Sequence, residues 1–78
     1  MKDFVENLLK TIVDSPDKVV VNESLDTSGV TNLELVVAPL DMGKVIGKGG
    51  KIIKAIRDLT RILAVKQNRR VNVILKEG

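Results

Sequence analysis

The spacing of hydrophobic residues in the first half of the chain predicts one helix followed by two strands. Asp3, with Glu6 three residues later, has the pattern of a helix N-cap with a capping box, and apolar residues recur at helical spacing up to about Asp14. Polar and apolar residues alternate over 18–25, which is typical of a half-buried strand. Apolar residues on both faces of 30–38 predict a central strand. The buried side of the first strand is expected to hold Val19, Val21 and Leu25.

The second half of the chain predicts two helices separated by a glycine-rich break. A short helix over 42–46, capped by Asp41, is followed by Gly47-Lys48-Gly49-Gly50, a segment that a helix interior disfavours. A longer amphipathic helix is expected over 51–67. Its buried face is predicted to comprise Ile52, Ile53, Ile56, Leu59 and Leu63, with Thr60 near the edge.

The last strand is predicted over 70–76, after Asn68 as a left-handed cap of the long helix. The turn residues 26–29 allow the first two strands to pair as a hairpin. Because the last strand follows a helical connection, we expect it to lie parallel to its neighbour. The order α-β-β-α-α-β therefore predicts an α+β fold, in which a three-stranded mixed sheet carries its helices on one face.

Composition excludes several classes of function. The chain has no Cys and no His, so it offers no thiolate or imidazole for metal binding or nucleophilic catalysis, and its single aromatic residue is Phe4. We expect no enzymatic activity, no metal, no cofactor and no small-molecule substrate. The N-terminus does not resemble a signal peptide, and no apolar run is long enough to span a membrane, so a cytoplasmic location is expected.

Charge is divided unevenly along the chain. Residues 1–41 contain three cationic and eight anionic side chains, whereas residues 42–78 contain ten and two. A basic half of this kind favours an anionic partner, of which phosphate is the commonest. Charge alone leaves open that these residues only form a solvated surface.

The glycine segment matches neither common nucleotide-binding motif. Gly43 and Gly47 are too close for a phosphate-binding loop of the Walker type, and the dinucleotide motif would require glycine where Ile52 stands. The segment nevertheless lies at the start of the long helix, where backbone N–H groups and the helix dipole favour an anion. Lys48 and Lys51 add positive charge there.

Residues 45–56 resemble the signature of K-homology (KH) domains, in which an apolar pair precedes G-x-x-G and a helix follows. The order of elements resembles the type II variant, and the resemblance covers the whole chain, so that 1–78 is expected to be a single KH domain. It implies that the loop clamps about four nucleotides of single-stranded RNA. The residues expected to contact RNA are Lys44, Val45, Ile46, Gly47, Lys48, Gly49, Gly50, Lys51, Ile53, Lys54 and Arg57.

Segments 13–17, 37–39, 41–48 and 70–73 further resemble a family of small bacterial proteins that consist of one KH domain. This resemblance implies self-association or pairing with a larger KH-containing partner, and a role in post-transcriptional, cell-envelope and division control. A dimer contact is expected at Ala55, Ile62 and Val65, unless the first helix covers them. An alternative hypothesis is a protein-interaction module with only incidental affinity for nucleic acid.

Overall fold

Three helices and three strands follow one another in the predicted order in a computed structural model that describes all 78 residues. The regular elements are α1 (Lys2–Ile12), β1 (Val20–Leu25), β2 (Val30–Val37), α2 (Met42–Ile46), α3 (Lys51–Lys66) and β3 (Arg70–Glu77). Short 3₁₀ turns η1 (Pro16–Lys18), η2 (Pro39–Asp41) and η3 (Lys48–Gly50) connect them. The α+β fold class and the order α-β-β-α-α-β are confirmed.

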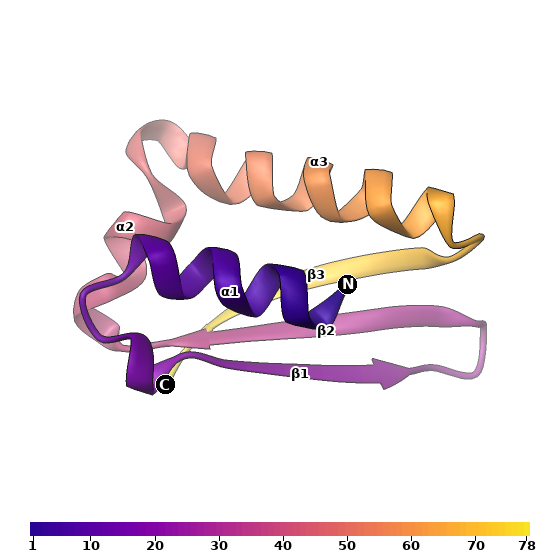
Figure 1. The fold of residues 1–78 in the computed structure, drawn as a ribbon, viewed down its shortest axis with the longest axis horizontal. Coiled ribbons are helices and arrows are strands. Elements are labelled where there is room, and N and C mark those ends of the chain that lie inside the picture. Colours follow the sequence, from indigo (N-terminus) through magenta and orange to yellow (C-terminus); the bar gives the residue numbers. More distant parts are fainter.

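The sheet has the order β1-β2-β3, with β2 in the centre. Strands β1 and β2 pair antiparallel, so that Val21 lies opposite Leu35, whereas β2 and β3 pair parallel, so that Leu33 lies opposite Val73. All three α-helices lie on one face of this sheet (Figure 1). The mixed sheet and the one-sided helical layer are therefore as predicted.

One hydrophobic core joins the helices to the sheet. Alternate residues of β2 point into it, and all four of these side chains are buried: Thr31, Leu33, Leu35 and Val37. The helices contribute Val5 and Leu9 from α1, Val45 from α2, and Ile53 and Ile56 from α3. Because the core lies between two layers, α2 and α3 are held against the sheet on both sides of the glycine segment.

The buried face of α3 is rotated relative to the predicted one. It comprises Ile53, Ile56, Thr60 and Ala64, whereas the side chains of Ile52 and Leu59 are 38% and 45% exposed. The hydroxyl of Thr60 donates a 2.6 Å hydrogen bond to the carbonyl oxygen of Ile56, which satisfies this polar group in the core. The prediction that Ile52 and Leu59 belong to the core was wrong.

Of the two predicted helix N-caps, one is wrong and the other is confirmed in position only. Helix α1 begins at Lys2 with Met1 as N-cap and no capping hydrogen bond from a side chain, so Asp3 lies in the first turn instead. Asp41 is the N-cap residue of α2, as predicted, but its side chain makes no capping hydrogen bond. Its buried carboxylate instead accepts hydrogen bonds of 3.1 Å from the backbone N–H groups of Asp14 and Ser15. Asp41 thus ties the chain after α1 to the start of α2.

The predictions for the end of β1 and for the end of α3 had different outcomes. Leu25, predicted on the buried side of β1, is 72% exposed because it lies at the end of the strand, next to the hairpin turn. Asn68 has φ 55°, as expected for a left-handed cap. The N–H groups of Asn68 and Arg69 bond back to the carbonyl oxygens of Val65 and Ala64, a Schellman arrangement that turns the chain from α3 into β3.

No helix combines the length and the apolar character that crossing a membrane requires.

Candidate functional site

The glycine segment forms a tight turn between α2 and α3 at one end of the molecule (Figure 1). Gly47 ends α2 with φ 75° and ψ 172°, and Gly49 and Gly50 have φ 66° and 75°. Side chains rarely adopt such positive φ angles, so the turn depends on glycine. At Gly49 and Gly50 the space beside the Cα atom is open, so the outside of the turn can approach another backbone closely.

Gly47 is required for a second reason. A Cβ atom at this position would lie 2.6 Å from Cγ1 of Ile52, closer than two carbon atoms can pack. Ile52, which sequence analysis placed in the core, therefore covers the inner side of the loop. This contact fixes the loop against the first turn of α3.

Two backbone N–H groups of the loop region form hydrogen bonds within the loop. The N–H of Gly50 donates to the carbonyl oxygen of Gly47 at 3.1 Å, and the N–H of Lys51 donates to that of Lys48. The N–H groups of Gly50 and Lys51 are therefore already bonded within the loop. No side-chain acceptor of the protein bonds to a loop amide. The amides at the tip of the loop belong to Lys48 and Gly49.

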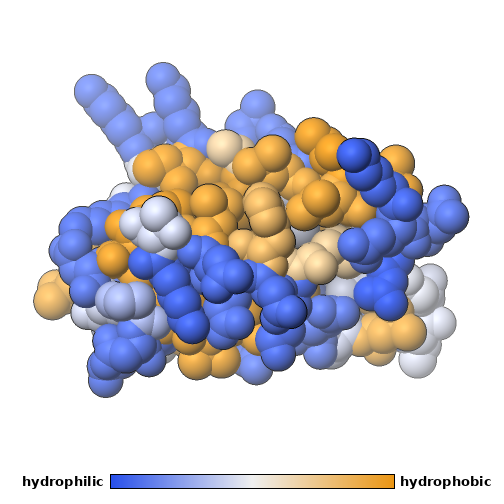
Figure 2. Space-filling view, viewed as in Figure 1, coloured by the Kyte–Doolittle hydropathy of each residue, from blue (hydrophilic) through white to orange (hydrophobic).

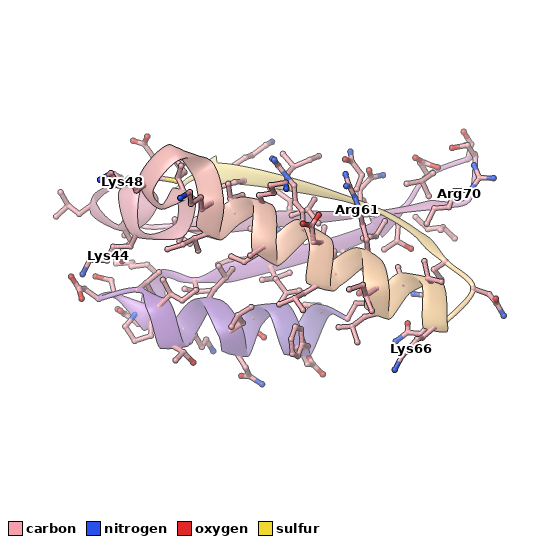
Figure 3. The ribbon with its side chains drawn as sticks, turned by 90° about the horizontal axis from the view of Figure 1, so that it is seen from above. Lys44, Lys48, Arg61, Lys66 and Arg70 are labelled. Carbon is pink, nitrogen blue, oxygen red and sulfur yellow. The ribbon has the colours of Figure 1, made fainter.

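The loop and α3 carry cationic side chains without acidic partners. The four ion pairs of the protein involve Lys10, Lys44, Arg69 and Lys76. The unpaired cations of the loop, of α3 and of the first residue of β3 are Lys48, Lys51, Lys54, Arg57, Arg61, Lys66 and Arg70. Between Asp41 and Asp58 the chain has no acidic residue. Apart from Lys66, which points to the α1 side of α3 (Figure 3), these cations make the surface electrostatically suited to an anion.

Lys44 differs from the other cations predicted at the site. It forms an ion pair with Asp14, in the segment that follows α1. In Figure 3 the Lys44 side chain points to the α1 side, whereas Lys48 lies at the loop on the β3 side of α3. The structure therefore does not bring Lys44 together with the loop lysines.

The apolar residues predicted at the site lie at different depths. Val45 is fully buried and Ile53 is only 7% exposed, so both support the loop from beneath. Ile46 and Ile52 are each 38% exposed and reach the surface beside the loop. The accessible apolar surface at the loop is therefore formed by Ile46 and Ile52, and Ile52 was missing from the predicted site.

Three basic residues outside the predicted site lie together at the far end of α3. Arg61, Arg69 and Arg70 line one surface hollow together with Ala64, Val65 and Val71. Arg69 lies in the α3–β3 turn and Arg70 begins β3, so only the folded chain brings them into the same hollow as Arg61. Their clustering in the sequence as Arg69-Arg70 was the available signal.

A band of hydrophobic side chains is exposed on the helical layer, over α3 and its border with α1 (Figure 2). Ile62 and Val65 are 56% and 73% exposed, and Ala55 is exposed as well. Leu59 and Phe4 are exposed on the same layer. The first helix therefore does not cover the residues for which a dimer contact was predicted.

The mixed sheet, the one-sided helices and the glycine turn between α2 and α3 together define a type II KH fold. A known structure has the same fold: the crystal structure of Era in complex with MgGDPNP and nucleotides 1506–1542 of 16S ribosomal RNA. It matches with a TM-score of 0.64 at 20% sequence identity, over 97% of this chain and 29% of that chain. This similarity concerns the fold alone.

The family model described as "KhpA/KhpB, KH domain" matches residues 2–75, and the chain belongs to this family. It is 51% identical over 73 residues to the RNA-binding protein KhpA of Clostridium perfringens, over 94% of this chain and 96% of that protein. It is 52% identical to the RNA-binding protein KhpA of Clostridium acetobutylicum over the same shares. The KhpA of Chlamydia caviae is 42% identical over 77 residues, 99% of this chain and 97% of that protein. The resemblance to small bacterial KH proteins is thus confirmed.

Proposed function

We propose that this chain is an RNA-binding protein whose Gly47–Gly50 loop clamps about four nucleotides of single-stranded RNA. One observation carries the proposal: a positive-φ glycine turn exposes lysines that have no acidic partner, at the start of a basic helix. Its relatives of about 50% identity are named RNA-binding proteins, which supports the same function.

The phosphate groups would lie against the outside of the loop. The amides of Lys48 and Gly49 are placed to donate to a phosphate oxygen, and open space beside Gly49 and Gly50 permits close approach. The ammonium groups of Lys48 and Lys51 would contribute charge at that point. Lys54 and Arg57, one and two turns further along α3, would contact the phosphates that follow.

The bases would lie beside the exposed parts of Ile46 and Ile52. The only aromatic ring of the chain, Phe4, is on α1 and therefore not at the loop. Because no ring is available for stacking, we expect weak base selection and binding dominated by the phosphate backbone.

The proposal is tested by placing acidic side chains in the loop, with the double variant Lys48→Asp/Gly49→Asp. Aspartate tolerates the left-handed conformation of Gly49 better than most residues, so the fold should persist. We expect loss of measurable binding to an unstructured RNA octamer in a fluorescence titration, while the unfolding temperature falls by only about 5 °C and the variant remains folded. Undiminished affinity would contradict the proposed loop contact.

A matched control is Gly29→Asp/Lys66→Asp. It makes the same change in net charge and replaces a glycine that also has positive φ and open space beside it. Gly29 lies in the β1–β2 turn, and Lys66 points to the α1 side of α3 (Figure 3). The control should retain most of the affinity for RNA, which would separate a local contact from a general effect of charge.

A second candidate function, self-association or pairing with a larger KH protein, is supported by the exposed hydrophobic band. Ala55, Leu59 and Ile62 follow one another at i, i+4 and i+7 on α3, with Val65 beside them. An apolar stripe of this kind suits packing against the same helix of a second copy. Two linked modules would also raise the affinity for longer RNA.

Ile62→Asp tests this contact, because the exposed side chain can be replaced without disturbing the core. We expect sedimentation equilibrium to show a dimer for the native chain and a monomer for the variant. A native chain that remains monomeric at high concentration would contradict self-association. Loss of RNA binding together with the dimer would show that the two functions are linked.

On family resemblance, we place the protein in the bacterial cytoplasm, as a non-enzymatic factor in post-transcriptional control of the cell envelope and of division.

A further inference from the structure

The hollow at the far end of α3 lies between this helix and the start of β3, away from the glycine loop. Arg61, Ala64 and Val65 come from α3, and Arg69, Arg70 and Val71 from the turn and the start of β3. Ala64 is buried and Val71 is half-buried, so the floor of the hollow is apolar while arginines form its rim.

The charges of these three arginines are not equivalent. The guanidinium of Arg69 lies 3.4 Å from the carboxylate of Glu23 on β1. Arg61 and Arg70 form no ion pair, although Asp58 stands three residues before Arg61 on α3. Two cations therefore remain without a partner at the rim of an apolar hollow, an arrangement that favours an anion with an apolar portion.

A row of cations connects the loop with this hollow. Lys54, Arg57 and Arg61 recur at i, i+3 and i+7 on one side of α3, and none of them forms an ion pair. In Figure 3, Lys48, Arg61 and Arg70 lie on the β3 side of α3, whereas Lys66 points to the α1 side. From Lys51 to Arg61 the helix rises by about 15 Å.

We propose that single-stranded RNA continues beyond the four nucleotides at the loop and that Arg61 and Arg70 bind a phosphate of the continuing strand. A guanidinium group can donate two parallel hydrogen bonds to the oxygens of a phosphate, and it remains charged at any physiological pH. The apolar floor formed by Ala64 and Val71 would lie under the attached nucleoside. This inference rests on the proposed function of the loop and extends the same binding path.

The test compares two lengths of RNA, a uridine tetramer and a uridine octamer, with native protein and with Arg61→Gln/Arg70→Gln. A longer strand offers more binding registers, so the variant is compared with native protein at each length. We expect the variant to bind the octamer roughly tenfold more weakly and to bind the tetramer unchanged. The slope of log affinity against log salt should fall by about 0.7 for the octamer, because one phosphate contact is lost.

Two further variants make the result specific. Lys18→Gln/Lys66→Gln removes the same charge from two exposed, unpaired lysines outside the hollow, and it should bind both lengths like native protein. Arg61→Lys/Arg70→Lys keeps the charge and should restore the salt dependence for the octamer.

The outcomes separate this inference from the function on which it rests. Equal weakening at both lengths, or no weakening for the octamer, would overturn the extended path and leave the loop function intact. If native protein binds neither length, the extended path and the RNA-binding function are both wrong.

Discussion

Two glycine-containing turns of this protein treat their backbone N–H groups in opposite ways. In the β1–β2 turn, where Gly29 has φ 85°, the carboxylate of Asp26 accepts hydrogen bonds from the N–H groups of Ser28 and Val30 at 2.9 and 3.0 Å. The Ser28 hydroxyl and the Asn32 amide donate to the same carboxylate at 2.7 and 3.3 Å. This turn therefore contains its own anion.

The turn between α2 and α3 contains no anion. The nearest preceding acidic residue, Asp41, is buried and accepts hydrogen bonds from Asp14 and Ser15. The glycine turn has the cationic residues Lys48 and Lys51, whereas the hairpin turn has the anionic acceptor Asp26. The hairpin turn therefore satisfies its donors with an internal anion, whereas the turn between α2 and α3 leaves the donors at its tip and its cations available to an external anion.

The largest effect is expected from Gly47→Ala, which breaks the geometry of the turn between α2 and α3. The φ and ψ angles of Gly47 belong to a region that is almost confined to glycine, and the new methyl group would collide with Ile52. We expect a loss of about 3 kcal/mol in the free energy of unfolding. In a thermal melt followed by circular dichroism, the unfolding temperature should then fall by at least about 10 °C.

Gly49→Ala is the matched control, since Gly49 also has positive φ but open space beside its Cα atom. Its cost should be only about 1 kcal/mol, the strain of a left-handed backbone. Equal costs at Gly47 and Gly49 would mean that the contact with Ile52 does not define the turn.

The position of this turn could be predicted from the sequence, but the contacts around it could not. Glycine and lysine spacing is local, so the break between the helices and the charge at the start of α3 could be predicted from neighbouring residues. Parallel pairing of β3 also followed, because a helical connection leaves little alternative. These features depend on short stretches of chain.

The features that sequence analysis missed depend on distant residues. Asp41 bonds to backbone groups 26 and 27 positions earlier, which no local pattern reveals. The face of α3 was misplaced because Ile52 and Ile53 are adjacent and equally apolar, and only the loop decides which of them enters the core. The arginine hollow needs both α3 and β3 in place.

A second, smaller effect is expected from Asp41→Ala, which tests whether the hydrogen bonds that this carboxylate accepts within the protein stabilise the fold. The substitution leaves the partly buried N–H groups of Asp14 and Ser15 without their acceptor. Hydrogen bonds to a charged group contribute about 2 kcal/mol, and we expect a loss of that order in urea unfolding.

Asp41→Asn should recover part of the stability, because its carbonyl oxygen can accept one of the two bonds. If Asp41→Ala unfolds at the same urea concentration as native protein, Asp41 does not hold α1 to α2.

The smallest effect is expected at the hairpin turn, as a dependence of stability on pH. The hydrogen bond from the Ser28 hydroxyl, followed by that from the Val30 amide, lowers the pKa of Asp26 below its ordinary value of 3.8. The folded chain therefore binds this proton less readily than the unfolded chain. The stabilisation from Asp26 is complete above the ordinary pKa and is lost as the pH falls through the lower folded value.

Asp26→Asn removes this titration, and melting temperatures of variant and native protein measured from neutral to acid pH should reveal it. The variant should be slightly less stable above pH 3.8, and the difference should shrink below that value. Asp17→Asn, at an exposed residue whose side chain forms no hydrogen bond or ion pair, controls for the loss of one charge. Protonation of Asp26 removes the negative charge that the hairpin N–H groups bind, so these groups should then lack an anionic acceptor, like those of the glycine loop. A difference in stability that does not depend on pH would contradict an internal anion in the hairpin turn. The contrast with the turn between α2 and α3 would then fail as well.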